Sequence, residues 1–321
     1  MKKPIIAGSL LYLVALGVSS DSPDVEKGGV GSITASEIAA HVTHLASDEL
    51  EGREAGTEGG RKAAEYIAKA FASFGLKPID ETGDFFQPFE ARGRRTENVV
   101  GFLEGSHPTR KSEVLIIGAH YDHLGKNKET GAIYHGADDD ASGTAVMMEL
   151  AEAFANDEKR PERSLLFMAF GAEEKGLIGS RFYVENPLLP MEKTRWMVNL
   201  EMMGRGDKGK VTVMLLSRMP DPLLDALGDG GVEHELDLVD GGQAHINSGD
   251  QYPFHKADIP ILCFYGGDNH PDYHQPTDTA DKIQPEWMQS VARLVYHSVA
   301  ACASGEEIPG SLLEEEGAEA R

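Results

Sequence analysis

Three short apolar runs constrain the fold of this 321-residue chain more than any other feature of its sequence. They cover residues 114–119, 164–170 and 196–200, and apolar side chains fill nearly every position rather than every second one. Continuous apolar runs of this length are typical of strands that are covered on both faces. The chain is therefore expected to build a sheet that helices enclose.

Segments with helical spacing of apolar residues separate these and further predicted strands. Strands are predicted at residues 85–90, 98–103, 114–119, 165–170, 197–201, 211–216 and 259–265, and helices at residues 34–46, 58–74, 143–154, 177–184 and 285–303. Because strands and helices alternate from residue 98 onward, we expect an α/β fold. Its form is a three-layer sandwich, with a mixed, mostly parallel sheet and helices on both faces.

Each of the three apolar runs leads into side chains that bind divalent metals. His120 and Asp122 follow the first run, Glu173 and Glu174 follow the second, and Glu201 follows the third. In open α/β sheets, ligands bind just beyond the carboxyl ends of the strands. These side chains therefore predict one shared metal pocket.

Two loops add further candidate ligands. The loop at residues 136–143 carries Asp138, Asp139 and Asp140, and a carboxylate there can bridge two metals because it offers two oxygens. The loop lacks the alternating acidic pattern and the terminal Glu of a calcium-binding loop. His274 follows the last predicted strand and gives a second imidazole. We rank the remaining candidate histidines lower, as surface or outer residues: His44, His123, His135, His245, His255 and His270.

The ligand inventory points to zinc. Two imidazoles and three or four carboxylates, with no Cys, suit Zn²⁺, with Mn²⁺ or Co²⁺ as substitutes. This set exceeds what one catalytic zinc requires. It therefore predicts two ions about 3.5–4 Å apart.

Adjacent residues at the strand ends suggest a division of roles. Glu173 and Glu174 repel each other unless a cation or a proton intervenes. Neighbouring extended residues point to opposite sides, so one can bind metal while the other faces water as a general base. Asp122 is placed to accept the second ring N–H of His120. A solvated acidic turn and an ordinary His–Asp hydrogen bond are the alternatives.

In their order along the chain, these motifs resemble those of the co-catalytic zinc aminopeptidases. This family includes secreted bacterial leucyl aminopeptidases and is related to glutamate carboxypeptidase and the glutaminyl cyclases. The resemblance covers residues 36–303. The matching segments are residues 45–48, 52–53, 118–122, 136–143, 171–174, 199–202 and 273–274.

The resemblance implies the zinc exopeptidase fold and two Zn²⁺ ions per chain. Asp138 would bridge the ions, His120 and Glu201 would complete one site, and Glu174 and His274 would complete the other. Many members of the family have Asp where this chain has Glu201. The longer side chain still ends in a carboxylate.

The resemblance also implies a reaction, hydrolysis of the N-terminal bond of peptides that have a free N-terminus. Glu173 would be the general base, Asp122 would orient His120, and Tyr273 would stabilise the oxyanion. The alternatives are a glutamate-type carboxypeptidase, a single-zinc glutaminyl cyclase and, from another class, a catalytically dead binding ectodomain.

Charge and the first residues bear on partners and location. The net charge of −23 argues against nucleic acid and anionic membranes, because both would be repelled. Lys2 and Lys3 precede an apolar run at residues 5–18, which predicts a signal peptide over residues 1–20. This run is shorter than the ~20 residues of a spanning helix. We therefore expect an exported protein, periplasmic or secreted, without stable membrane insertion after signal cleavage.

The remaining boundaries follow from composition. Residues 21–33 are predicted to be a flexible lead, residues 34–304 the zinc peptidase domain, and residues 305–321 an acidic disordered tail. Export would permit a disulfide between Cys263 and Cys302. The sequence leaves that pairing open, together with the oligomeric state and the preferred N-terminal residue.

Overall fold

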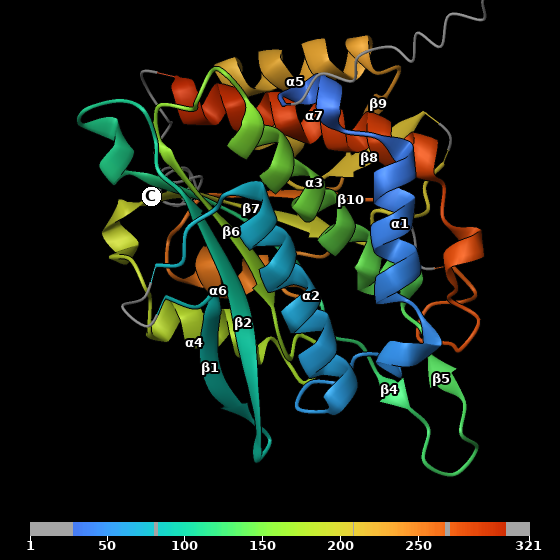
Figure 1. The fold of residues 1–321 in the computed structure, drawn as a ribbon. Coiled ribbons are helices and arrows are strands. Elements are labelled where there is room, and N and C mark those ends of the chain that lie inside the picture. Colours follow the sequence, from blue (N-terminus) through green and yellow to red (C-terminus); the bar gives the residue numbers. More distant parts are fainter. Residues whose placement is uncertain (1–27, 80–82, 208, 267–269, 306–321) are drawn as a thin grey trace, which may run out of the picture.

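The three apolar runs lie side by side in the sheet of the computed structural model, which describes residues 28–79, 83–207, 209–266 and 270–305. Within these residues the sheet has eight strands in the order β1-β2-β6-β3-β7-β10-β8-β9 (Figure 1). The strands are β1 (Phe86–Ala91), β2 (Arg94–Leu103), β3 (Val114–His120), β6 (Ser164–Phe170), β7 (Thr194–Glu201), β8 (Lys210–Val213), β9 (Asp237–Asp240) and β10 (Ile261–Tyr265).

The four central strands are parallel, and both margins of the sheet include antiparallel pairs. Strand β3 pairs in parallel with β6 and β7, and β10 continues the parallel set beside β7. Strand β2 runs antiparallel to β1 and β6, and β8 runs antiparallel to β10. Every residue of β3 and β6 is buried, as the continuous apolar runs require.

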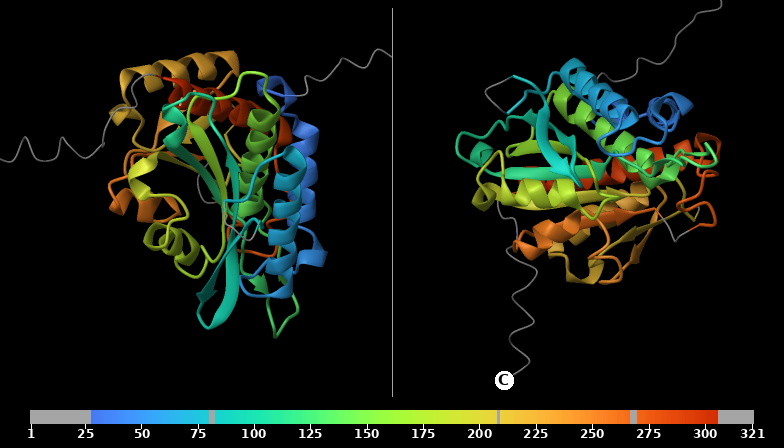
Figure 2. Two further views of the ribbon diagram at one scale, coloured as in Figure 1. Left: turned by 60° about the vertical axis from the view of Figure 1, so that its left-hand side comes forward. Right: turned by 90° about the horizontal axis from the view of Figure 1, so that it is seen from below.

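Helices cover both faces of the sheet (Figure 2). Helices α2 and α3 pack on one face with α1 and α7 against them, and α5 packs on α7. Helices α4 and α6 contact each other and the opposite face. The helices are α1 (Ala35–Leu45), α2 (Glu58–Phe74), α3 (Gly143–Asn156), α4 (Ile178–Glu185), α5 (Asp221–Glu233), α6 (Gln251–Lys256) and α7 (Pro285–Ser304). The predicted mixed α/β sandwich is confirmed.

Local signals in the sequence explain where two of the helices begin and end. The side chain of Thr34 accepts a hydrogen bond from the Glu37 amide and caps α1. Helix α2 ends at Gly75, whose φ of 86° suits glycine. Of the predicted lead, the described residues include Ile33, which is fully buried, and a 3₁₀ turn at Val30–Ser32.

Several predicted features lie outside the described residues, and others differ from the structure. The predicted signal peptide and all but one residue of the predicted acidic tail fall outside. The strand predicted at residues 211–216 ends at Val213, and a 3₁₀ turn at Leu216–Arg218 follows. Cys263 and Cys302 are both free thiols. Among the described helices, none has the length and hydropathy needed to cross a membrane.

Candidate metal centre and active site

The carboxyl ends of the parallel strands bring the predicted ligands to one edge of the sheet. His120 is the last residue of β3, and Glu201 is the last residue of β7. Glu174 follows β6 after a short turn. Asp139 comes from the buried loop between Gly136 and α3, and His274 comes from the loop after β10.

These side chains form two groups of donors that share Asp139. In the first group, His120 Nε2 lies 3.2 Å from Asp139 Oδ1 and 3.4 Å from Glu201 Oε1. In the second group, His274 Nε2 lies 3.1 Å from Asp139 Oδ2 and 3.3 Å from Glu174 Oε1. Asp139 thus presents one carboxylate oxygen to each group.

The donor spacing fits divalent metal ions. Two ligand atoms that bind one tetrahedral zinc at about 2.0–2.1 Å lie about 3.3–3.4 Å apart. The four separations match this value within about 0.3 Å. Among the described residues, His120 Nε2 and Glu174 Oε1 are buried atoms without a hydrogen-bond partner. Unpartnered buried donors and acceptors are costly, so these atoms are placed as ligand atoms would be.

Asp139, and not Asp138 as predicted, lies between the two groups of donors. Asp138 Oδ1 accepts a hydrogen bond from the Gly204 amide at 2.7 Å, and its Oδ2 lies 3.0 Å from His270 Nε2. Asp138 therefore faces the loop after β7 and contributes to neither group of donors. The physical reason is the backbone of the loop, which directs the carboxylates of these two neighbours to different partners.

Asp140, the last of the three consecutive aspartates, binds backbone amides of neighbouring elements. Its Oδ1 accepts hydrogen bonds from the Gly143 and Met202 amides at 3.0 Å. Its Oδ2 accepts from the amide of His120 at 3.3 Å. Asp140 thereby fixes the ends of β3 and β7 relative to α3.

The carboxylate of Asp139 is well suited to remain ionised. Burial opposes ionisation, but the imidazoles of His120 and His274 hold the pKa of Asp139 well below its ordinary value. An anionic carboxylate with two imidazole neighbours is the form that binds a metal ion.

Asp122 orients its neighbours differently from the prediction. The Nδ1 of His120 lies 3.1 Å from the backbone carbonyl of Asp122, whereas the Asp122 carboxylate is 4.0 Å away. The carboxylate instead accepts a hydrogen bond from the Glu173 amide at 2.9 Å. Asp122 therefore positions His120 through its carbonyl and Glu173 through its side chain. Burial raises the pKa of Asp122 to about 7, and His120 opposes this rise.

Glu173 and Tyr273 lie beside the two groups of donors. Burial raises the pKa of Glu173 well above its ordinary value, and the neighbouring His120 opposes this rise. The ring of Tyr273 stacks on His274, with the ring centroids 3.9 Å apart. Both side chains are thus neighbours of candidate ligands, Glu173 of His120 and Tyr273 of His274.

Three residues that support the centre were not assigned a role from the sequence. Arg53 is fully buried and donates hydrogen bonds to the carbonyls of Tyr121 and Gly136 at 2.8 and 2.9 Å. Asp278 accepts hydrogen bonds from the amides of Asp138 and Asp139. The short Gly52-Arg53 motif was the sequence signal for Arg53, whereas Asp278 had none.

His123 is the third of these residues. It is fully buried, and its Nδ1 lies 2.8 Å from Glu174 Oε1 and 3.8 Å from Asp139 Oδ2. The sequence predicts a surface or outer residue at this position. Its place in the His-Tyr-Asp-His segment, three positions after His120, was the available signal.

A small cavity opens beside the first group of donors. It has a volume of about 140 Å³. Its lining includes Glu201, Met202, Met214, His245, Tyr265 and Tyr273. The cavity therefore joins a candidate metal ligand to apolar side chains.

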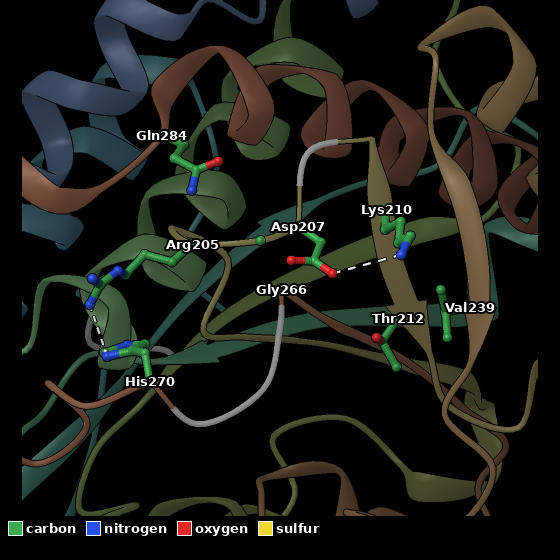
Figure 3. Close-up of a pocket in the computed structure, with 9 residues that line it drawn as sticks. Arg205, Asp207, Lys210, Thr212, Val239, Gly266, His270 and Gln284 are labelled. Carbon is green, nitrogen blue, oxygen red and sulfur yellow. Dashed lines mark hydrogen bonds and ion pairs between the residues drawn. The ribbon is translucent and has the colours of Figure 1, made fainter.

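A larger cavity of about 400 Å³ is lined by Arg205, Lys210 and His270 among others (Figure 3). Arg205 lines it and donates a hydrogen bond to His270 Nδ1 at 2.8 Å, and His270 Nε2 contacts Asp138. This chain of contacts holds Asp138 away from the two groups of donors. Lys210 lines the same cavity and pairs with Asp207.

Comparison with known proteins agrees with this geometry. The model of peptidase family M28 matches residues 98–299. Aminopeptidase YwaD of Bacillus subtilis is 29% identical over 229 residues, which are 68% of this chain and 47% of that protein. Leupeptin-inactivating enzyme 1 of Streptomyces exfoliatus is 26% identical over 297 residues, or 91% of this chain and 62% of that protein. The chain thus spans about half to three fifths of the length of these relatives.

Solved structures show the same fold. The zinc aminopeptidase BSAP from Bacillus subtilis superposes with a TM-score of 0.68 at 18% identity, covering 87% of this chain and 98% of that chain. LapB from Legionella pneumophila superposes with a TM-score of 0.69 at 21% identity, covering 85% of this chain and 73% of that chain. Together with the family match over most of the sheet and the site, these findings show that the chain belongs to peptidase family M28.

Proposed function

We propose that this chain is a metallo-aminopeptidase that uses two zinc ions to hydrolyse the N-terminal bond of peptides. The observation that carries the proposal is the position of Asp139, which presents one oxygen to each of two groups of donors. His120 and Glu201 complete the first group, and Glu174 and His274 complete the second. Two ions bridged by one carboxylate are an arrangement used by aminopeptidases.

The reaction needs a nucleophile and a path for its proton. Zinc, when bound, acts as a Lewis acid toward the scissile carbonyl and makes water acidic enough to lose a proton near neutral pH. Glu173 accepts the proton of the attacking water at its carboxylate and returns it to the nitrogen of the leaving amine. The Asp122 carboxylate holds the Glu173 backbone in place for this transfer.

Tyr273 is assigned to the carbonyl oxygen. Its ring stacks on His274 and lines the small cavity, so its hydroxyl can reach a substrate that enters there. A hydroxyl hydrogen bond to the oxyanion stabilises the charge that develops in the transition state.

The small cavity suits one apolar side chain at the N-terminus of the substrate. Met202, Met214 and Tyr265 supply apolar surface, and Glu201 places the candidate metal centre at its border. The carboxylates at the centre also attract the positively charged amine of a free N-terminus. We therefore expect a preference for residues such as Leu or Met over charged ones.

The described lining of this cavity includes neither Arg nor Lys. A glutamate-releasing carboxypeptidase needs cationic groups for the two carboxylates of its substrate. The aminopeptidase assignment is therefore favoured over the carboxypeptidase alternative.

A panel of substrates tests the assignment. Zinc-loaded protein is incubated with Leu, Met, Asp and Lys amides, with Nα-acetyl-Leu amide, and with peptides that end in Glu or begin with Gln. We expect release of free Leu and Met, and no cleavage of the acetylated amide. Release of C-terminal Glu, or formation of pyroglutamate with one zinc per chain, would replace the proposal with one of its alternatives.

We also propose that the protein is exported. Support comes from Lys2, Lys3 and the apolar residues 5–18. Sequencing the N-terminus of the protein from the periplasmic or culture fraction should show cleavage near residue 20. An uncleaved chain confined to the cytosolic fraction would contradict export.

A further inference from the structure

His123 is a buried imidazole whose ring nitrogens make no well-aligned hydrogen bond, although Nδ1 lies 2.8 Å from Glu174 Oε1. It follows β3, has no exposed surface, and neither of its ring nitrogens has a hydrogen-bond partner among the described residues. Leaving a buried polar group unsatisfied is costly. A residue held in this way is expected to have a partner other than protein hydrogen-bonding groups.

The loop before Asp139 makes room for the ring. A Cβ atom on Gly136 would lie 2.5 Å from His123 Cγ, so any side chain there would displace the imidazole. Gly136 also has a φ of 58°, which L side chains rarely adopt. The backbone therefore holds space for the His123 ring beside the second group of donors.

The ring points its Nδ1 at the same point as the second group. Nδ1 lies 2.8 Å from Glu174 Oε1 and 3.8 Å from Asp139 Oδ2, and the rings of His123 and His274 are 5.7 Å apart. Although Nδ1 and Glu174 Oε1 are close, neither has a hydrogen-bond partner. Short contacts without hydrogen-bond alignment are expected of two ligand atoms that face one ion, and His120 Nε2 in the first group lacks a partner in the same way.

We propose that His123 is a fourth protein ligand of the second metal position, together with Asp139, Glu174 and His274. The inference rests on the metal centre of the proposed function. It makes the two positions unequal, since the second has two imidazoles and the first has only His120. The second position should therefore fill first and keep its ion when the first is empty.

A role as an outer hydrogen-bond donor to Glu174 is the competing explanation, and His123→Asn separates the two. The Asn amide can take the place of Nδ1 and donate a hydrogen bond to Glu174, but it is a poor zinc ligand. If His123 is only a donor, His123→Asn should preserve metal affinity. If His123 is a ligand, the affinity should fall by more than the ~10–100-fold typical of losing an outer partner.

The measurement isolates the second position by emptying the first with Glu201→Gln. Zinc affinity is measured by competition with a chelator, and zinc content by mass spectrometry, for E201Q, E201Q/H123N and E201Q/H135N. His135 is the matched control because its ring is also largely buried near the loop, and it contacts Asp48 and Pro276 rather than the donors.

We expect E201Q and E201Q/H135N to bind one zinc with equal affinity, and E201Q/H123N to bind it more than about 100-fold more weakly. A loss of about 100-fold or less in E201Q/H123N would overturn the inference. Circular dichroism checks that each variant is folded. Pulsed EPR of Cu²⁺ bound to E201Q is a second test that leaves residue 123 intact: two coordinating imidazoles are expected, and one would overturn the inference.

The outcome for the His123 ligand assignment can be distinguished from the outcome for the proposed function. If zinc-loaded wild-type protein cleaves no peptide but H123N weakens zinc binding, the proposed function fails and the ligand assignment stands. If peptides are cleaved and H123N leaves zinc binding unchanged, the ligand assignment fails alone.

Discussion

Two regions of this molecule place a histidine against a carboxylate away from bulk solvent, and they differ in what surrounds the pair. At the sheet edge, His120 lies 3.2 Å from Asp139 and 3.4 Å from Glu201. In the helix layer, His41 of α1 lies 3.6 Å from Glu149 of α3. At the sheet edge, ends of different strands and loops bring several donors to one point. In the helix layer, two helices simply pack a polar pair between them.

The partners of the helix-layer pair are hydrogen-bonding groups of the protein. His41 Nδ1 lies 2.7 Å from the Tyr66 hydroxyl, and Glu149 Oε2 accepts a hydrogen bond from the Thr34 amide. Glu149 Oε1, like His120 Nε2, has no hydrogen-bond partner among the described residues, so a lone unpartnered atom does not distinguish the two regions. Burial lowers the pKa of His41 to about 4 and raises the pKa of Glu149 to about 8, so both groups are neutral at pH 7. A His–carboxylate pair shielded from solvent is therefore not enough to indicate a metal site. Convergence of three or more donors on one point is needed.

The largest expected effect comes from substituting Asp139, with the same substitution at the adjacent Asp138 as the control. Asp139→Asn removes the shared carboxylate, so zinc affinity should fall by more than about 100-fold and hydrolysis should become undetectable. Asp138→Asn is the matched control, and its loss of affinity should not exceed about 10–100-fold, because the Asp138 carboxylate contacts Gly204 and His270 rather than a candidate ligand. Chelator competition and Leu-amide hydrolysis measure both variants. A greater loss in D138N than in D139N would restore the assignment made from sequence.

The next effect separates catalysis from metal binding within the centre. Glu173→Gln should lower kcat for Leu-amide hydrolysis by about 10²–10⁴-fold, because the proton acceptor is lost while every ligand remains. Zinc content should stay at two ions per chain. Full activity in E173Q would reject Glu173 as the general base.

Metal removal should lower the stability of the folded chain. The effect should depend on the donors at the strand ends and not on the His41–Glu149 pair. Zinc at about 1,000 times its Kd should stabilise the folded chain by about 4 kcal/mol, and chelation should remove this contribution. Thermal unfolding with and without chelator measures the change, with Asp139→Asn and Glu149→Gln as comparisons. E149Q should respond to chelation as the wild type does, and D139N should respond little. An equal response in D139N would show that the stabilising ion binds elsewhere.

The helix layer should also give the stability a pH dependence, which is small over any single pH unit. The folded chain keeps the Glu149 proton to about pH 8, whereas the unfolded chain loses it near 4.5. The folded state thus binds more protons in this window, and stability falls by up to about 1.4 kcal/mol per pH unit as pH rises. The stability contribution is complete below pH 4.5. His41 stays neutral in the window, and the neighbouring Glu37 and Glu152 raise the pKa of Glu149 further.

Glu149→Gln should flatten this dependence between pH 4.5 and 8. Urea unfolding at a series of pH values, at constant ionic strength, compares the variant with the wild type. Identical pH profiles would show that Glu149 ionises normally in the folded chain.

Sequence patterns were sufficient for the central sheet and for most of the site. The uninterrupted apolar runs predicted β3, β6 and β7, and the order of parallel strand ends brought His120, Glu174 and Glu201 together as expected. Strand β9 was not predicted, because its four residues are largely exposed and carry no clear alternation. Short elements at the sheet margin depend on tertiary contacts more than on local pattern.

The choice among three consecutive aspartates could not be made from sequence. It depends on the backbone of the loop after Gly136 and on Gly204, which holds Asp138 from a position 66 residues away. The burial of His123 likewise depends on the space that Gly136 leaves. Long-range contacts of this kind have no local signal, whereas the strand-end ligands do.

The most direct test of the account is an anomalous difference map from crystals of the zinc-loaded protein, with data collected at the X-ray absorption edge of zinc. Two peaks about 3.5–4 Å apart are predicted. The Asp139 carboxylate should lie between them, with His120 and Glu201 at one peak and Glu174 and His274 at the other. A single peak, or two peaks bridged by Asp138, would contradict the account.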